Sequence, residues 1–285
     1  MTKNIDTLVD DIHALLEPDA HSEIDEEAWK KFCDGLRSSF ERHFVAKDTG
    51  REPKLYMSSV GRPCHRELWY KINKQEEAEP LRPETFLKFL LGDIYEHILL
   101  FLSRQAGHSV AGEQDLQEFA GLRGRRDAII DGVVVDVKSA STRSFDKFVD
   151  GKIYEDDPFG YIDQLQLYLR SSEEDDLVSE TDVAAFLVVN KEMGKIHLTK
   201  VARNAENYKD KVAYIQSVVA RPEPPERPYA AVPDGKSGNE KLRVPCSYCD
   251  FKHTCWPDLR TFIYSNGPRY LTNVERTPDV PELRK

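Results

Sequence analysis

The chain has 285 residues, of which 40% are apolar and 32% charged, and its formal net charge is −10. This length suits one large domain or two small ones, and the apolar share is enough to bury a core. There is no run of about 18 uncharged apolar residues, so no transmembrane helix and no membrane partner are expected. The N-terminus also lacks the basic, apolar and small-residue pattern of a signal peptide.

The first fifty residues are acidic and have a helical pattern. They hold twelve Asp or Glu against six Lys or Arg, which accounts for −6 of the net charge. Apolar residues recur at helical spacing as far as Pro18, and a second helix is expected over about 23–44. This region caps the core, docks a protein partner or is a solvated extension. Since every motif described below follows residue 55, deleting 1–48 is expected to leave the chemistry intact.

The elements expected after that alternate between helix and strand. In chain order they are a helix over 83–106, strands within 114–138, a helix over 161–170, strands over 183–189 and 195–201, and a helix over 203–220. Residues 221–235 contain five prolines and are predicted to form an extended connector. The order indicates a mixed α/β fold.

One predicted hairpin collects two acids and a lysine. Asp131-Gly132 is a two-residue turn signal, and a hairpin closed there places Asp127 opposite Asp136. Directly opposed side chains share a face with Cβ atoms about 4.5–5.5 Å apart, and Lys138 lies on that same face. Two facing carboxylates repel each other, a divalent cation removes the repulsion, and oxygen ligands suit Mg²⁺ or Mn²⁺.

This patch can support phosphodiester hydrolysis. A bound ion polarises the phosphodiester and lowers the pKa of a bound water, while Lys138 positions that water and stabilises the developing negative charge. The alternative is an exposed hairpin with surface Asp and Lys residues. The second strand favours a site, because it is apolar on one face and mixed on the other within an otherwise apolar segment.

Other side chains are candidates to complete the site. Either Glu96 or His97, on the long helix, is expected to be a third metal ligand. Gln164 and Tyr168 are four residues apart on a helix and share a face from which they could hold a nucleotide or serve the catalytic lysine. The candidate phosphate contacts, each of which could also be a plain surface charge, are Arg125, Arg126 and Arg143.

Four cysteines form a second candidate metal site. Cys64 stands alone, and three more follow far along the chain in a C-x2-C-x5-C pattern: Cys246, Cys249 and Cys255. In a chain without a secretion signal, this pattern favours metal over disulfides. Two occupants are possible: a multi-atom metal cluster on the four cysteines, or a zinc ion for which His253 is one of the ligands. The fifth cysteine, Cys33, is predicted to be a buried apolar helix residue.

These motifs, in this order, resemble the PD-(D/E)xK nuclease superfamily, and within it the RecB/AddB-like exonucleases with an iron–sulfur cluster, including the CRISPR-associated ones. The resemblance covers about residues 56–258, and a phage homologue would fit. It rests on Cys64 before a basic and aromatic helix, Gly92 to Glu96, Gly124 to Asp127, Asp136-Val-Lys138, Gln164 to Tyr168 and the terminal cysteines. The family's usual histidine is displaced by one position, to His97.

The resemblance implies an α/β nuclease core, with a mixed central sheet flanked by helices, clasped by a [4Fe–4S] cluster on the four cysteines. It implies a metal-dependent exonuclease acting on DNA ends, single-stranded or resected, in the bacterial or phage-infected host cytoplasm. The expected ranges are 1–50 for the acidic helices, 51–265 for the core and 266–285 for a tail. The alternatives are a DNA-binding or assembly subunit of a recombination or CRISPR-adaptation complex, and a structure-selective endonuclease of the same fold.

Overall fold

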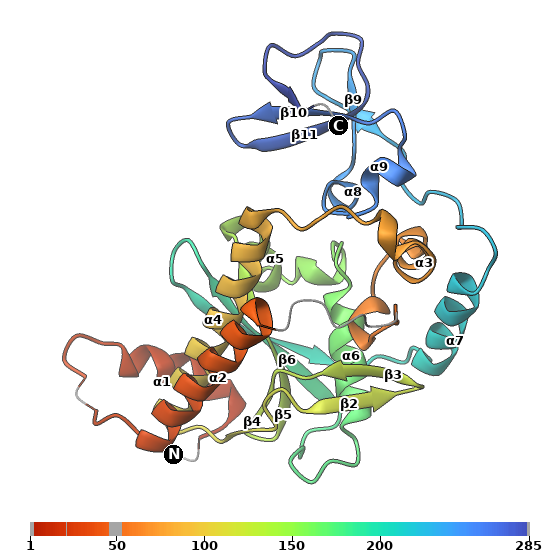
Figure 1. The fold of residues 1–285 in the computed structure, drawn as a ribbon. Coiled ribbons are helices and arrows are strands. Elements are labelled where there is room, and N and C mark those ends of the chain that lie inside the picture. The colour runs from red at the N-terminus through yellow and green to blue at the C-terminus, as the bar shows by residue number, and fades with distance from the viewer. Residues whose placement is uncertain (1–2, 21, 46–52, 284–285) are drawn as a thin grey trace. The chain divides into compact units, whose positions relative to one another are not determined.

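The computed structural model describes residues 3–20, 22–45 and 53–283 (Figure 1). The chain forms two compact units, each built from separated segments. The first unit holds residues 1–61 and 82–212, and the second holds 62–81 and 213–285. These units do not coincide with the three ranges expected from the sequence. In the described residues, no helix is both long and apolar enough to cross a bilayer.

The first unit is built around a five-stranded mixed sheet in the order β1-β4-β5-β6-β7 (Figure 1). The strands β5 and β6 run parallel, and the other neighbours in the sheet are antiparallel. The strands are β1 Val110–Ala111, β4 Ala128–Ile130, β5 Val133–Ala140, β6 Val183–Asn190 and β7 Ile196–Ala202. A separate two-stranded sheet pairs β2 Leu116–Phe119 with β3 Leu122–Arg125.

Helices cover both faces of this sheet. The helices that contact the sheet are α1 Leu8–Leu15, α4 Pro83–Gln105, α5 Thr142–Val149 and α6 Tyr161–Ser171, whereas α2 Glu26–Phe44 packs on α4. Apolar residues of α1 and α4 pack on the face formed by Val133 and Val135 of β5 together with Leu187 of β6. Because side chains alternate along a strand, Asp136 and Lys138 lie on the opposite face, which α6 contacts.

The structure confirms the predicted hairpin. The pairs Ala128 with Val135, Ile129 with Val134 and Ile130 with Val133 give the expected register. Asp131 and Gly132 have φ values of 50° and 80°, as a type I′ turn requires at both central positions. Asp127 directly precedes β4 and therefore lies beside Asp136.

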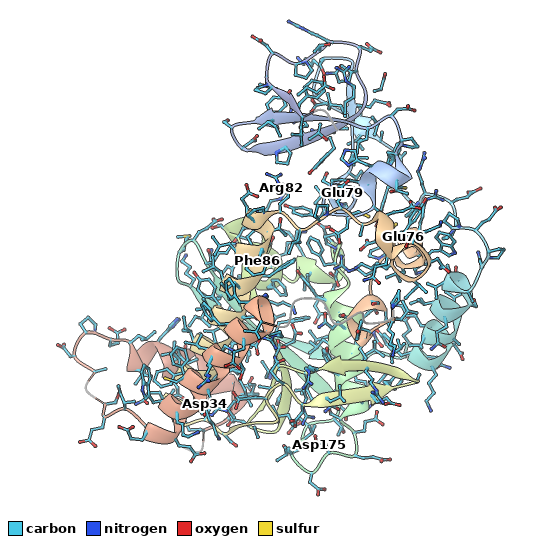
Figure 2. The ribbon with its side chains drawn as sticks, viewed as in Figure 1. Asp34, Glu76, Glu79, Arg82, Phe86 and Asp175 are labelled. Carbon is cyan, nitrogen blue, oxygen red and sulfur yellow. The ribbon has the colours of Figure 1, made fainter. Side chains whose placement is uncertain are left out.

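The other expected helices and strands of this unit are also present, with small changes at their ends. The acidic region contains α1 and α2, and α2 packs along α4. On this helix pair, Phe86 of α4, which is labelled in Figure 2, meets the rings of His43 and Phe44 edge-on. Cys33 is exposed on α2, so the prediction that it is buried is wrong. Its position on the helix turns it away from the contact with α4. The helix α5 was not predicted.

The second unit combines short helices with a small antiparallel sheet in the order β12-β10-β11-β9-β8. Its elements are α3 His65–Asn73, β8 Val232–Pro233, β9 Glu240–Lys241, α8 Val244–Ser247, α9 Lys252–Cys255, β10 Arg260–Tyr264, β11 Gly267–Asn273 and β12 Glu282–Leu283. The helix α7, Tyr208–Val219, spans the boundary between the units. Trp69 and Tyr70 of α3 form a core with Phe251, whose ring stacks on Tyr70 at 5.5 Å.

Candidate active site and cysteine pocket

Strand β5 places Asp136 and Lys138 beside Asp127. Asp136 is 1% exposed, and its Oδ2 lies 2.5 Å from Lys138 Nζ. Asp127 Oδ2 accepts a hydrogen bond of 2.7 Å from the backbone N–H of Val137, which holds this carboxylate against the strand. Gln164 of α6 makes a long contact of 3.5 Å from its Nε2 to Asp136 Oδ1. The hairpin and α6 thus bring together four of the predicted site residues.

Helix α4 directs Glu96, and not His97, towards these carboxylates. Glu96 Oε1 accepts a 2.7 Å hydrogen bond from Gln114 Nε2, and its charge acts on Asp127. His97 faces the other way, where its Nε2 lies 2.9 Å from Ser39 Oγ of α2. The geometry therefore favours Glu96 as the third carboxylate, a choice that the sequence left open.

Burial raises the pKa values of all three acids, and neighbouring carboxylates add to the effect for Glu96 and Asp127. Burial, followed by the charges of Asp93 and Asp136, raises the pKa of Glu96 from 4.5 to about 7. Burial also raises the pKa of Asp127, with the nearby Glu96 and Asp136 charges as further causes. The pKa of Asp136 is raised by burial despite Lys138. One lysine therefore does not neutralise the three carboxylates, and a divalent cation would.

The residues present fit Mg²⁺ or Mn²⁺ in charge and donor type. The buried Asp136 Oδ2 accepts no hydrogen bond of acceptable geometry, although Lys138 Nζ is close to it. Across the described residues, no group of three or more His, Cys, Asp or Glu side chains is arranged to hold a metal ion. In the carboxylate site, each acid is instead held by its own neighbour: Val137 N–H, Lys138 or Gln114.

Two residues of this site were not found from the sequence. Lys138 Nζ lies 4.9 Å from the centre of the Tyr161 ring, at the start of α6. Gln114, the partner of Glu96, has φ +55° in a loop. The position of Tyr161, one helical turn before Gln164, could have indicated its place in the site. Nothing in the sequence indicates the role of Gln114. Tyr168 lies behind Gln164, and burial raises the pKa of its hydroxyl.

The three arginines proposed as phosphate contacts have different environments. Arg125 and Arg143 are exposed. Arg126 is 1% exposed, and its guanidinium pairs with Asp115 at 3.0 Å and with Asp175 at 2.6 Å. A buried guanidinium that is already paired with two carboxylates is not available to DNA. The interpretation of Arg126 as a phosphate contact is therefore wrong, and its role is structural.

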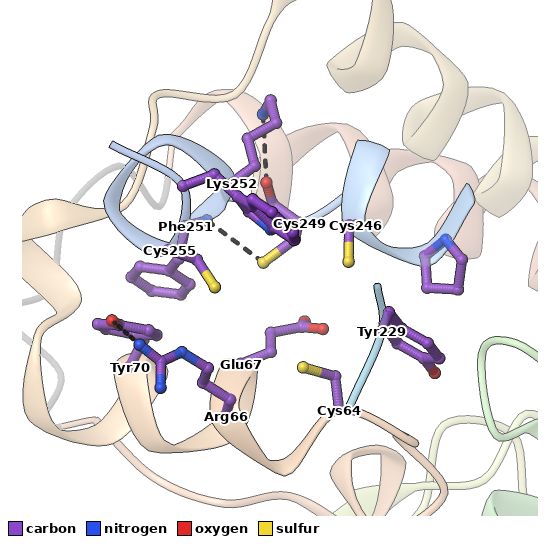
Figure 3. A pocket seen from close by; sticks show the side chains of 12 residues that line it. Cys64, Arg66, Glu67, Tyr70, Tyr229, Cys246, Cys249, Phe251, Lys252 and Cys255 are labelled. Atoms are coloured by element: carbon purple, nitrogen blue, oxygen red, sulfur yellow. Dashed lines mark hydrogen bonds between the residues drawn. The ribbon is translucent and has the colours of Figure 1, made fainter. Parts of the chain in front are cut away.

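The four predicted cysteines line one pocket of the second unit. In Figure 3, the sulfurs of Cys64, Cys246, Cys249 and Cys255 point into a common space, and the carboxylate of Glu67 enters it as well. All four are free thiols. Aromatic rings surround them, and the Phe251 N–H donates to Cys249 Sγ at 3.4 Å.

The electrostatics of this pocket oppose free thiolates. Burial raises the pKa of Cys64 to about 11 and that of Cys246 to about 12, with neighbouring thiols and Glu67 as further causes. Bound metal would reverse this by stabilising thiolates. Four converging thiols suit an iron–sulfur cluster in donor type. His253 does not line the pocket: its two ring nitrogens contact Glu79 and Thr261 Oγ1, which argues against its role as a zinc ligand.

The chain was compared with protein families, curated proteins and solved structures. A family model described as "PD-(D/E)XK nuclease superfamily" matches residues 10–256. Among solved structures, one titled "Crystal structure of SSO0001" is 15% identical and covers 77% of this chain and 93% of its own. Its TM-score of 0.43 is too low to carry an argument. No curated protein matches the chain.

Proposed function

Because the chain belongs to the PD-(D/E)XK nuclease superfamily, we propose that it is a Mg²⁺- or Mn²⁺-dependent exonuclease that hydrolyses phosphodiester bonds from DNA ends. The family supports a hydrolase acting on nucleic-acid phosphodiesters. Specificity for ends, for unpaired DNA and for a role in recombination, repair or end processing is the proposal made here.

The observation that carries the proposal is the collection of Glu96, Asp127 and Asp136 beside Lys138 within one partly buried site. These three carboxylates would hold the ion, which supplies Lewis acidity and an activated water when bound. Lys138 carries the positive charge that can stabilise the oxygen on which negative charge develops. The Tyr161 ring beside its ammonium group limits where that group can move.

The test is degradation of end-labelled linear DNA and of closed circular DNA, each with Mg²⁺, Mn²⁺ or EDTA. We expect loss of the linear substrate with either metal, no loss in EDTA and survival of the circle. Asp136→Asn should be inactive. Asp150→Asn, in an exposed pair with Lys152, is the matched control and should behave as wild type. Cleavage of the circle would identify an endonuclease, and wild-type activity of Asp136→Asn would overturn the site.

We also propose that the cysteine pocket holds a [4Fe–4S] cluster with a structural role, and the converging free thiols support this. Protein purified without oxygen should be brown and contain iron and sulfide. Replacing Cys64, Cys246, Cys249 or Cys255 with Ala should remove the visible absorption. Cys33→Ala is the control, because Cys33 is exposed on α2. A colourless protein with stoichiometric zinc would overturn the proposal.

A further inference from the structure

An open groove of about 580 Å³ runs from the surface of the first unit to Tyr168, beside the carboxylate site. Its lining residues are Lys54, Tyr56, Ser58, Leu116, Arg123, Gly124, Arg125 and Tyr168. Tyr168 follows Gln164 by one turn of α6, and Gln164 Nε2 lies 3.5 Å from Asp136 Oδ1, so one end of the groove lies near the proposed chemistry.

The groove is cationic although the whole chain is acidic. Lys54, Arg123 and Arg125 line it, and none of the described residues that line it is acidic. Arg123 Nε contacts Glu118 Oε2 at 3.2 Å in an exposed pair, which a phosphate can replace at low cost. Arg125 Nη1 donates to the backbone carbonyl of Gln114 at 2.6 Å, which fixes the direction of its side chain.

The groove also exposes apolar side chains. Binding of phosphates alone would not require them. Tyr56 is 43% exposed and Leu116 is 56% exposed. The backbone of Tyr56 is bridged to Arg123, and its N–H donates to Ser59 Oγ at 3.3 Å, so the base of the side chain is held. An exposed ring on a held backbone, among cations, is the combination that stacks on unpaired bases.

Gly124 keeps the inner end of the groove open to Tyr168. A Cβ added at Gly124 would lie 2.9 Å from Tyr168 Oη and 3.0 Å from Met57 Cβ. Any other residue would therefore displace the tyrosine or the backbone segment that carries Tyr56. The glycine of the predicted Gly124 to Asp127 motif thus serves the groove, while Asp127 serves the carboxylate site.

We propose that this groove binds an unpaired nucleic-acid strand, with Tyr56 stacking on a base and Arg123 and Arg125 contacting phosphates. This inference rests on the proposed function in one respect: the bound strand is taken to lead towards the carboxylates, where it would be cleaved. A duplex would offer only its phosphates here, because the faces of its bases are covered by their neighbours. The groove therefore selects single strands over duplexes.

The test measures binding without cleavage, by fluorescence anisotropy in the absence of divalent metal, to a labelled thymidine oligomer and to an abasic oligomer of equal length. Tyr56→Ala should weaken binding of the thymidine oligomer roughly 5- to 150-fold and leave the abasic one nearly unchanged, since stacking needs a base. Tyr56→Phe keeps the ring and should keep the affinity. Tyr214→Ala is the matched control, since that tyrosine is 52% exposed outside the groove.

Arg123→Ala should weaken binding of both oligomers, because phosphates are present in each. The slope of log affinity against log salt should fall by about 0.7 for one lost phosphate contact on a single strand. Arg37→Ala is the matched control: this arginine is also exposed and paired with a glutamate, Glu41.

The outcomes separate this inference from the proposed function. Equal losses on the two oligomers for Tyr56→Ala, or equal wild-type affinity for duplex and single strand, would overturn the groove. If the groove variants behave as expected but no metal supports cleavage, the groove is correct and the nuclease proposal fails. If cleavage occurs but the Tyr56 and Arg123 variants bind like wild type, the nuclease proposal is correct and the groove fails.

Discussion

The protonation of Glu96 makes the stability of the folded protein depend on pH. The Glu96 pKa rises from 4.5 in an unperturbed glutamate to about 7 in the folded protein. Between these values the folded protein keeps a proton that the unfolded chain has released. The stability contributed by this group is therefore fully present below about pH 4.5 and is lost as the pH rises through about 7. Asp127 and Asp136, whose pKa values are also raised, act in the same direction.

We therefore expect the metal-free protein to have a lower free energy of unfolding at about pH 8 than at about pH 5, by a few kcal/mol. Mg²⁺ should restore most of the loss, since it binds the ionised carboxylates of the folded state. Urea unfolding at both pH values, with and without Mg²⁺, measures this. Glu96→Gln should flatten the pH dependence, whereas His97→Gln should not. A wild-type profile in Glu96→Gln would show that Glu96 is not in the cluster.

Substitutions of Lys138 and Asp136 should have different effects on metal binding and on catalysis. Lys138→Ala leaves the three carboxylates in place, so Mn²⁺ binding should persist while kcat falls roughly 10²- to 10³-fold, as when one stabilising donor is removed from a transition state. Asp136→Asn removes a ligand and should lose both. Calorimetric Mn²⁺ titration, paired with single-turnover cleavage of each variant, separates the two roles. Loss of Mn²⁺ binding in Lys138→Ala would contradict this division.

At the scale of elements, the acidic N-terminal helices belong to the core. Leu8 and Ile12 of α1 are fully buried against α4 and the sheet. Ser39 of α2 is buried and holds His97 of α4. Deletion of residues 1–48, which we expect to leave the chemistry intact, would therefore uncover the apolar face of α4 and lower the free energy of unfolding.

Leu8→Ala should lower the free energy of unfolding by about 2–5 kcal/mol, the usual cost of a cavity at a buried leucine. Asp10→Ala, at an exposed position of the same helix, should change it by less than about 0.5 kcal/mol. Urea denaturation of the two variants is the measurement. If both variants unfold at the wild-type urea concentration, α1 contributes nothing to the core.

Local signals were enough to predict some of these elements and not others. The Asp131-Gly132 turn fixes the register of its hairpin, so the neighbouring positions of Asp127 and Asp136 followed from the sequence alone. The choice between Glu96 and His97 did not, because it depends on the rotation of α4, which is set by packing against α2. Burial of Arg126 also depends on a distant residue, Asp175.

The C-terminal strands were missed although a signal was present. Tyr264 pairs with Gly267 across the two-residue loop Ser265-Asn266, between alternating segments. Pro268 is unfavourable inside a strand, since proline is confined to strand edges and ends. It stands at the second position of β11, where the strand begins. Proximity of the four cysteines was inferred from a resemblance, because spacing cannot place Cys64 beside residues so far along the chain.

At the scale of the whole molecule, the second unit should depend on its proposed cluster, since its aromatic core around Tyr70 and Phe251 lines the cysteine pocket. Cys246→Ser should make this unit sensitive to trypsin at residues 213–283 while the sheet of the first unit resists. Mass spectrometry of the fragments identifies the first cuts. Cys33→Ser is the control. A Cys246→Ser protein as resistant as wild type would show that the pocket does not stabilise the unit.

The division of the second unit between two distant segments has a consequence for biosynthesis. Helix α3 leaves the ribosome early, but Phe251, on which Tyr70 stacks, comes much later. The roughly 180 residues between them take on the order of ten to thirty seconds to translate. During that interval Trp69 and Tyr70 lack their core partner, and the thiol of Cys64 lacks the other three. The nascent chain therefore exposes an apolar helix and an oxidisable thiol until residues 246–255 have been made.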